Sequence, residues 1–164
     1  MSDAVLIELE ELVSQWKAEG HKVVFTNGVF DLLHPGHLHC LDSARSFGTK
    51  LIVAINSDES VKSLEKGDNR PIETEDVRAH NLTKIEGVDA VLVFSENTPL
   101  TAIVTLMPHV LVKGGDYLPQ CEDKAHPQYI VGSIEVKDHG GSVETISILP
   151  GHSTTEIIKN SNRD

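Results

Sequence analysis

The stretch Lys22-Val-Val-Phe-Thr-Asn-Gly-Val-Phe-Asp-Leu-Leu-His-Pro-Gly-His37 decides the fold class of this 164-residue chain. Its first part, residues 22–26, is rich in β-branched residues, which predicts a buried strand. Pro35 suits the first position of a helix, because its missing N–H costs nothing there. A helix is therefore expected over residues 35–47, with Gly48 as its stop. The stretch predicts a strand that leads directly into a helix.

The same alternation of strand and helix continues on both sides of this stretch. Four more apolar runs predict buried strands, over residues 51–55, 90–94, 110–112 and 142–148. Helical patterns cover residues 4–18, 58–64, 74–85, 100–107, 130–137 and 154–159. Continuous apolar strands separated by helices indicate a parallel sheet that is covered on both faces. We therefore predict a Rossmann-like, doubly wound α/β fold with a five-stranded parallel sheet, built as a single domain over residues 1–164.

The composition argues against nucleic acid and membrane as partners. With 14 basic and 25 acidic residues, the formal net charge is −11, which disfavours a non-specific nucleic-acid binder. Aromatic residues make up 4% of the chain, too few for a platform on which bases stack. No apolar run approaches the roughly 18 residues of a membrane span, and the first residues lack a secretory signal. Because Cys40 and Cys121 make no disulfide framework, we expect a cytoplasmic protein.

Two histidines stand at the predicted start of the helix that follows the first strand. His34 and His37 are three residues apart and share one face of that helix start. With the N–H groups of the helix N-terminus they form a site for phosphate oxygens, best used where charge develops in a phosphoryl-type transition state. One alternative is that they only cap the helix. Another is a metal site with His39, but no cysteine or close carboxylate completes such a ligand set, so no protein metal site is predicted.

The segment from Thr26 to His37 resembles the HxGH signature of the nucleotidyltransferase superfamily, specifically its cytidylyltransferase-like branch. This family transfers a nucleotidyl group from a nucleoside triphosphate to a phosphorylated acceptor and releases pyrophosphate. The resemblance implies that His34 and His37 contact the α- and β-phosphate oxygens. It also implies that Mg²⁺ accompanies ATP and keeps most of its waters. Nucleotide contacts are implied for Thr26, Asn27, Gly28, Phe30, Asp31 and Gly36.

Two motifs in the second half of the chain extend the resemblance to about residues 20–160. Lys113-Gly-Gly-Asp-Tyr117 follows the fourth predicted strand and is characteristic of heptose-phosphate nucleotidyltransferases. A lysine at that strand end lies beside the crevice where ligands bind, although generic turn chemistry explains the glycines equally well. The resemblance implies a catalytic role for Lys113 and nucleotide contacts for Gly114, Gly115 and Asp116. Ser153, Thr154 and Thr155 match the family motif that contacts the triphosphate, and Ser153 with Glu156 also forms a capping box.

Three residues in the first half of the chain are implied to hold the acceptor. Arg70 resembles the basic loop residue of ADP-heptose synthases, and Arg78 lies where family members carry an arginine directed at phosphate. Without the resemblance, both are equally well explained as solvated surface residues. Asp58 follows the second predicted strand and either binds a hydroxyl or caps the next helix. We expect the two histidines, the lysine and the two arginines to gather around one crevice at the strand ends.

The resemblance is greatest to D-glycero-β-D-manno-heptose 1-phosphate adenylyltransferases. It implies transfer of the adenylyl group of ATP to this sugar phosphate, giving ADP-heptose and pyrophosphate for lipopolysaccharide core or other heptose-containing glycans. The alternatives are a glycerol-3-phosphate or ethanolamine-phosphate cytidylyltransferase, an FAD synthetase, or a non-catalytic nucleotide-binding module. Because the chain begins at Met1 with one short helix, we expect the stand-alone form, and a homo-oligomer, dimer or larger, is its expected assembly. Residues 118–129 form a longer link than usual, which bears on the acceptor pocket or an oligomer contact.

Overall fold

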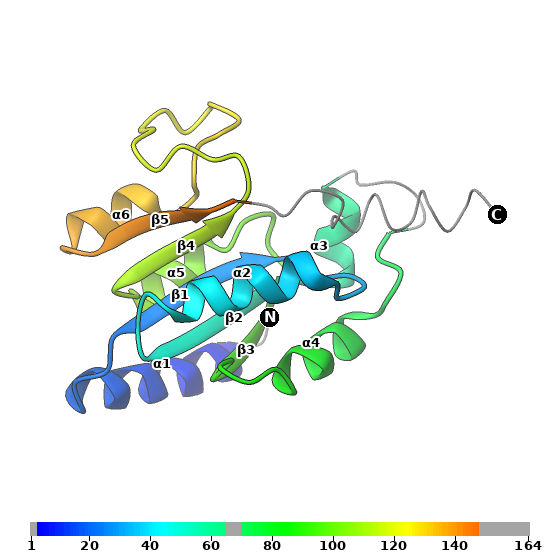
Figure 1. Cartoon of the computed structure of the whole chain (residues 1–164), viewed down its shortest axis with the longest axis horizontal. Helices are drawn as coiled ribbons and strands as arrows, with labels where there is room; N and C mark the ends of the chain where they lie inside the picture. The colour runs from blue at the N-terminus through cyan, green and yellow to red at the C-terminus, as the bar shows by residue number, and fades with distance from the viewer. Residues whose placement is uncertain (1–2, 65–69, 148–164) are drawn as a thin grey trace.

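The structure, a computed structural model, describes residues 3–64 and 70–147 (Figure 1). Within these ranges, five strands form one sheet in the order β3-β2-β1-β4-β5. Every neighbouring pair is parallel. The fold is therefore the predicted Rossmann-like α/β arrangement. The strands are β1 (Val23–Gly28), β2 (Lys50–Asn56), β3 (Ala90–Phe94), β4 (Val110–Gly114) and β5 (Ser142–Ile146).

The helices of the described ranges lie where the periodicity predicted them, with small shifts at their ends. They are α1 (Asp3–Ala18), α2 (Pro35–Arg45), α3 (Asp58–Ser63), α4 (Glu75–Thr83), α5 (Leu100–Leu106) and α6 (Ser133–Asp138). The last of these begins later than predicted, because its N-cap residue, Gly132, has a positive φ of 89°. The helix expected over residues 154–159 lies outside the described residues. No helix of the described ranges combines the length and apolar character that crossing a bilayer requires.

Alternate strand residues pack into two apolar layers, one on each face of the sheet. Helices cover both faces (Figure 1). On one face, Phe25 of β1 packs in a layer with Trp16 of α1 and Ile103 of α5, and α6 contributes to the same layer. On the other face, Val24 of β1 packs in a layer with Leu41 of α2, and α4 contributes there. Both faces are covered, which explains the continuous apolar runs within β1 to β4.

The path of the chain reverses between β1 and β4. From β1 the chain moves outward to β2 and β3, then crosses to β4 and β5 on the other side. Thr26 of β1 lies beside Val112 of β4 in the parallel register, so the two strands end at the same edge. In open α/β sheets, such a reversal leaves a crevice at the carboxyl ends of the two strands, and ligands bind there. The residues that follow β1 and β4 are therefore placed to form a site.

Candidate active site

The histidine pair lies at the N-terminus of α2, directly beyond β1. His34 is the N-cap of α2, and its Nδ1 accepts a hydrogen bond of 3.1 Å from the N–H of Gly36. The His37 ring stacks on the His34 ring, with centroids 3.8 Å apart and planes 25° apart, and lies 5.2 Å from the Phe30 ring. Since Nδ1 of His34 accepts, the neutral ring carries its proton on Nε2. His34 thus caps the helix, as one alternative held, and keeps an N–H donor at Nε2. The Gly36 N–H, which was predicted to bind phosphate, instead donates to His34 in this cap.

The loop between β1 and α2 adopts a backbone that needs support from outside. Phe30 and Leu32 have φ angles of 53° and 55°, which residues other than glycine seldom adopt. The Asp31 carboxylate between them accepts hydrogen bonds from the N–H groups of Ile72 (2.7 Å) and Glu73 (2.9 Å). Glu73 Oε1 accepts in turn from the N–H of Leu32 at 3.0 Å. These bonds fix the loop that leads into the histidine pair.

Arg70 belongs to the same support. Its side chain is buried, and its Nε lies 3.2 Å from Oδ2 of Asp31, which is buried as well. Removing one partner of a buried ion pair strongly destabilises a protein, because the other charge is left uncompensated. The structure therefore pairs Asp31 and Arg70 inside the protein, where they support the loop, and their contacts with nucleotide and acceptor stay predictions.

Arg78 is fully buried, with 0% of its surface exposed. Its guanidinium donates to the carbonyl oxygens of Val29 (3.0 Å), Asn56 (2.6 Å) and Glu73 (3.1 Å). It also donates to Oδ1 of Asp58 at 2.8 Å. The predicted direct contact with an acceptor phosphate does not fit this geometry, because the guanidinium faces carbonyl and carboxylate groups inside the protein. Arg78 instead ties the ends of β1 and β2 to α3 and α4.

Asp58 is the first residue of α3 and not its cap. Ser57 is the N-cap, with its Oγ accepting from the N–H of Ser60 at 3.1 Å. The Asp58 N–H donates to Oε1 of Glu75 at 3.1 Å, and its carboxylate, one third exposed at 33%, pairs with Arg78. The capping alternative is therefore wrong, since Ser57 fills that position. Binding of a substrate hydroxyl by Asp58 stays a prediction.

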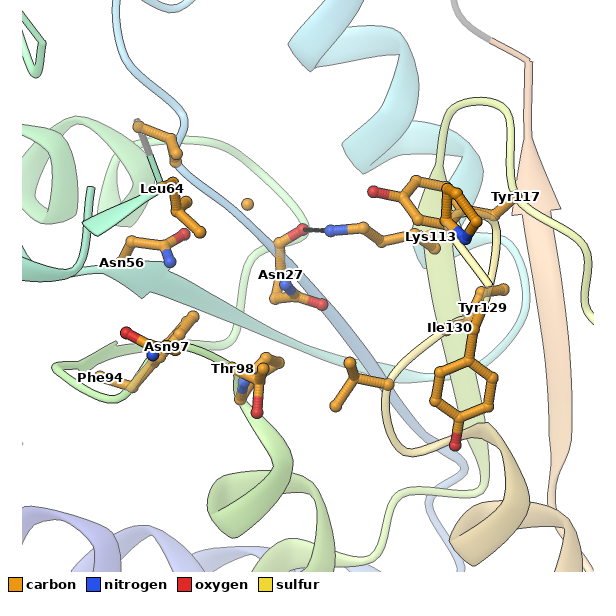
Figure 2. Close-up of a pocket in the computed structure, with 15 residues that line it drawn as sticks. Asn27, Asn56, Leu64, Phe94, Asn97, Thr98, Lys113, Tyr117, Tyr129 and Ile130 are labelled. Carbon is orange, nitrogen blue, oxygen red and sulfur yellow. Dashed lines mark hydrogen bonds between the residues drawn. The ribbon is translucent and has the colours of Figure 1, made fainter. Parts of the chain in front are cut away.

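Lys113, near the end of β4, bridges the two strands between which the sheet reverses. Its Nζ donates to the carbonyl oxygen of Asn27 at the end of β1, at 3.3 Å (Figure 2). The same Nζ lies 5.4 Å from the centroid of the Tyr117 ring. The structure thus brings the predicted lysine to the crevice, beside the end of the strand that leads to the histidines.

The glycines after Lys113 serve packing and turn geometry. A Cβ on Gly114 would lie 2.9 Å from Sγ of Cys40, so glycine here lets α2 approach β4 closely. Burial raises the pKa of the Cys40 thiol, and the lysine charge opposes this effect. Gly115 has a φ of 120°, and its N–H donates to the carbonyl of Ile146 at 2.9 Å. This amide is therefore not available for the nucleotide contact that the resemblance implied, and Asp116 beside it is exposed.

Of the remaining residues predicted to contact the nucleotide, some are buried under the strand end and others line a pocket. Thr26 and Phe30 are buried, and Oγ1 of Thr26 has no hydrogen-bond partner among the described residues. A Cβ on Gly28 would lie 3.0 Å from the Phe30 ring, so this glycine lets the ring fold back over the strand end. Asn27 and Gly28 line a pocket. Ser153, Thr154 and Thr155 lie outside the described residues.

That pocket, of about 380 Å³, opens at the carboxyl edge of the sheet (Figure 2). Its walls come from the ends of β1 to β4, from the turn after β3, and from the connection between β4 and α6. Asn56, Asn97 and Tyr129 line it and were not predicted as site residues. The one available signal was position, since Asn56 ends β2 and Asn97 follows β3, and parallel strands end at one edge.

The chain matches the family model described as Cytidylyltransferase-like over residues 25–160. It belongs to the cytidylyltransferase-like family. This match covers the histidine pair, Lys113 and the whole sheet beyond the first residues of β1. The prediction of a nucleotidyltransferase of this branch is confirmed, and with it the prediction of an enzyme.

Individual relatives agree with this family membership. The chain is 49% identical over 152 residues to the Bifunctional protein HldE of Koribacter versatilis (strain Ellin345), and 47% identical over 151 residues to that of Rhodopseudomonas palustris (strain BisB18). These matches cover 93% and 92% of this chain but only 29% of each relative's length. Among solved structures, the lipopolysaccharide core biosynthesis protein from Thermoplasma volcanium GSS1 is similar, with a TM-score of 0.60 and 26% identity. That similarity covers 79% of this chain and 98% of the other.

Mg²⁺ that arrives with the nucleotide stays a prediction for this cytidylyltransferase-like domain. Among its described residues, no three His, Cys, Asp or Glu side chains lie close enough together to hold a metal. Asp31 of the histidine loop and Asp58 at the start of α3 each pair with an arginine. Mg²⁺ keeps several waters and binds substrate phosphates readily, so it does not require a protein cage.

Proposed function

We propose that this chain transfers the adenylyl group of ATP to D-glycero-β-D-manno-heptose 1-phosphate, giving ADP-heptose and pyrophosphate. The observation that carries the proposal is the stacked pair of His34 and His37 beyond β1, with Lys113 at the end of the neighbouring β4. The string from Lys113 to Tyr117, characteristic of heptose-phosphate nucleotidyltransferases, supports the choice of acceptor. The identity of 47–49% to bifunctional HldE proteins supports it as well.

The reaction is an in-line displacement at phosphorus. An oxygen of the acceptor phosphate attacks the α-phosphorus of ATP, the bond between that phosphorus and the bridging oxygen breaks, and pyrophosphate leaves. The acceptor phosphate is already ionised at neutral pH, so no strong general base is needed. Catalysis then rests on positioning and on stabilising the charge that moves onto pyrophosphate. Mg²⁺, bound to ATP, neutralises part of the triphosphate charge.

Each predicted catalytic residue has a distinct part in this reaction. His34 and His37 donate to oxygens of the α- and β-phosphates, with the His34 proton placed on Nε2 by its cap bond. Lys113 neutralises phosphate where the two substrates meet. Residues 153–155 hold the β- and γ-phosphates. The buried Asp31–Arg70 pair and the buried Arg78 keep the histidine loop and the neighbouring strand ends in place.

The test offers the purified protein several nucleotides and acceptors in a matrix. ATP, CTP and GTP are each paired with heptose 1-phosphate, glycerol 3-phosphate, ethanolamine phosphate and flavin mononucleotide. Pyrophosphate release is recorded, and the product is identified by mass. The proposal requires ADP-heptose from ATP and heptose 1-phosphate. Turnover confined to CTP with a polyol phosphate would replace it with a cytidylyltransferase. ATP binding without pyrophosphate from any pair would indicate a non-catalytic module. A cytoplasmic location and a homo-oligomer stay predictions.

A further inference from the structure

The pocket beside Asn27 contains side-chain amides whose positions are set by serines of α3. Asn56 Nδ2 donates to Ser60 Oγ at 3.0 Å, and that hydroxyl donates to the carbonyl of Glu96 at 2.8 Å. Ser63 Oγ donates to the Ser60 carbonyl at 2.7 Å and lies 3.0 Å from Oδ1 of Asn97. One short helix therefore positions the amide at the end of β2 and the amide that follows β3. Groups held in place before binding lose less conformational entropy when a ligand arrives.

The rest of the lining mixes apolar side chains with amides and hydroxyls, and it carries little charge. Figure 2 places Asn97 and Thr98 on one side of Asn27, and Tyr117 and Tyr129 on the other. Among the described residues that line the pocket, Lys113 alone has a charged side chain. Amides and hydroxyls both donate and accept, as the hydroxyls of a sugar do. This lining suits an uncharged polyhydroxylated group that carries one phosphate, and it suits a triphosphate poorly.

The pocket and the histidine pair lie on opposite sides of the end of β1. Phe94 and Ile130 line the pocket and belong to the apolar layer of α1, α5 and α6. Phe30, which contacts His37, belongs to the layer of α2 and α4 on the other face. Lys113 reaches the end of β1 between the two, through its bond to the Asn27 carbonyl. Substrates bound on the two sides would bring their phosphates together near this lysine.

We propose that the pocket binds the sugar of the acceptor, with the amides of Asn56 and Asn97 and the Thr98 hydroxyl bonding to its hydroxyl groups. The phosphate of that sugar then points towards Lys113. This inference rests on the proposed function, and it assigns acceptor specificity to residues outside the histidine motif. Asn97 is the most direct residue to test, because it is exposed and its substitution leaves the core intact.

The experiment measures KM for ATP and for heptose 1-phosphate separately in wild type, Asn97→Ala and Thr98→Val. Thr83→Val, an exposed threonine at the end of α4, is the matched control. Loss of a hydrogen bond that leaves a sugar hydroxyl unpaired should raise the acceptor KM of Asn97→Ala roughly 10- to 100-fold. The KM for ATP should stay within about twofold of wild type. Thr98→Val should show a smaller rise in the acceptor KM, and the control none.

Two results would overturn the inference while leaving the proposed function standing. One is an unchanged acceptor KM in Asn97→Ala with normal ADP-heptose formation. The other is a rise confined to the KM for ATP, which would place the nucleoside in the pocket.

Calorimetric titration of wild type and Asn97→Ala with heptose 1-phosphate measures binding without turnover. Wild type should bind and the variant should bind roughly 10- to 100-fold more weakly. Failure of wild type to form ADP-heptose refutes the proposed function, whereas equal binding by both proteins refutes the pocket assignment alone.

Discussion

Replacing Arg78 with methionine removes a buried charge that four hydrogen bonds hold. Methionine keeps much of the length of arginine but has no donor. The carbonyl oxygens of Val29, Asn56 and Glu73 lose a partner, and the carboxylate of Asp58 loses its ion pair. All of these groups support the loop before the histidines or the strand end beside the pocket. The substitution should therefore lower the stability of the whole domain.

The size of the effect follows from the exposure of the groups involved. A buried acceptor left without a partner costs about 1–3 kcal/mol, and three carbonyls are affected. The Asp58 side chain is 33% exposed, so water compensates much of the free energy lost with its ion pair. Breaking a buried ion pair typically costs about 3–5 kcal/mol, which we adopt as the total after relaxation. For a domain of this size about 2–4 °C is lost per kcal/mol, so Tm should fall by roughly 6–20 °C.

Thermal unfolding followed by circular dichroism measures this fall, and Arg45→Met is the matched control. The Nε of Arg45 lies 3.7 Å from Asp89 and its side chain is 35% exposed, so its loss should cost at most about 1 kcal/mol. Equal melting of Arg78→Met and Arg45→Met would refute the structural role of Arg78. An unchanged Tm together with a raised acceptor KM would restore the direct phosphate contact that the sequence predicted.

Burial and two nearby lysine charges lower the pKa of His109 in the folded protein, so the unfolded chain binds the proton more readily. The free energy of unfolding should therefore fall as pH drops below about 6.5. Urea unfolding at pH 7.5 and 5.5 measures this, and His109→Gln should show a smaller difference; an equal difference would exclude His109 as the source. Gly132→Ala should destabilise by about 1–3 kcal/mol more than Gly140→Ala, because both have positive φ but only the first places a Cβ 2.8 Å from Ile103. Equal Tm values for the two variants would contradict the close packing of α5 against the turn before α6.

The sheet could be predicted because its information is local. Runs of β-branched residues marked each strand, and the predicted strand ranges overlap all of the observed ones. The end of β1 shows where this information stops. Asn27 and Gly28 have no strand preference of their own, yet they continue β1 through pairing with Ala54 and Ile55 of β2. That pairing depends on a partner that the local pattern does not reveal.

The site divides in a similar way. The histidines and Lys113 could be predicted, because a strand end followed by a helix fixes their place in the fold. The direction in which the two arginine side chains point could not be predicted from the sequence. Arg70 meets a carboxylate 39 positions away, and Arg78 meets a carbonyl 49 positions away. A charged residue in sequence suggests a surface or ligand contact, whereas burial requires partners that only the fold supplies. The same holds for Asn56 and Asn97, which become a pair only through the serines of α3.

The central claim is that the histidine pair stabilises charge during nucleotidyl transfer. The most direct measurement is kcat for pyrophosphate release from ATP and heptose 1-phosphate in His37→Ala, with exposed His39→Ala as control. Loss of one charge-stabilising donor should lower kcat by about 10²–10³-fold. His37 is only half-buried, so Tm should change little, and His39→Ala should keep wild-type kcat. A His37→Ala protein with wild-type kcat would contradict the account.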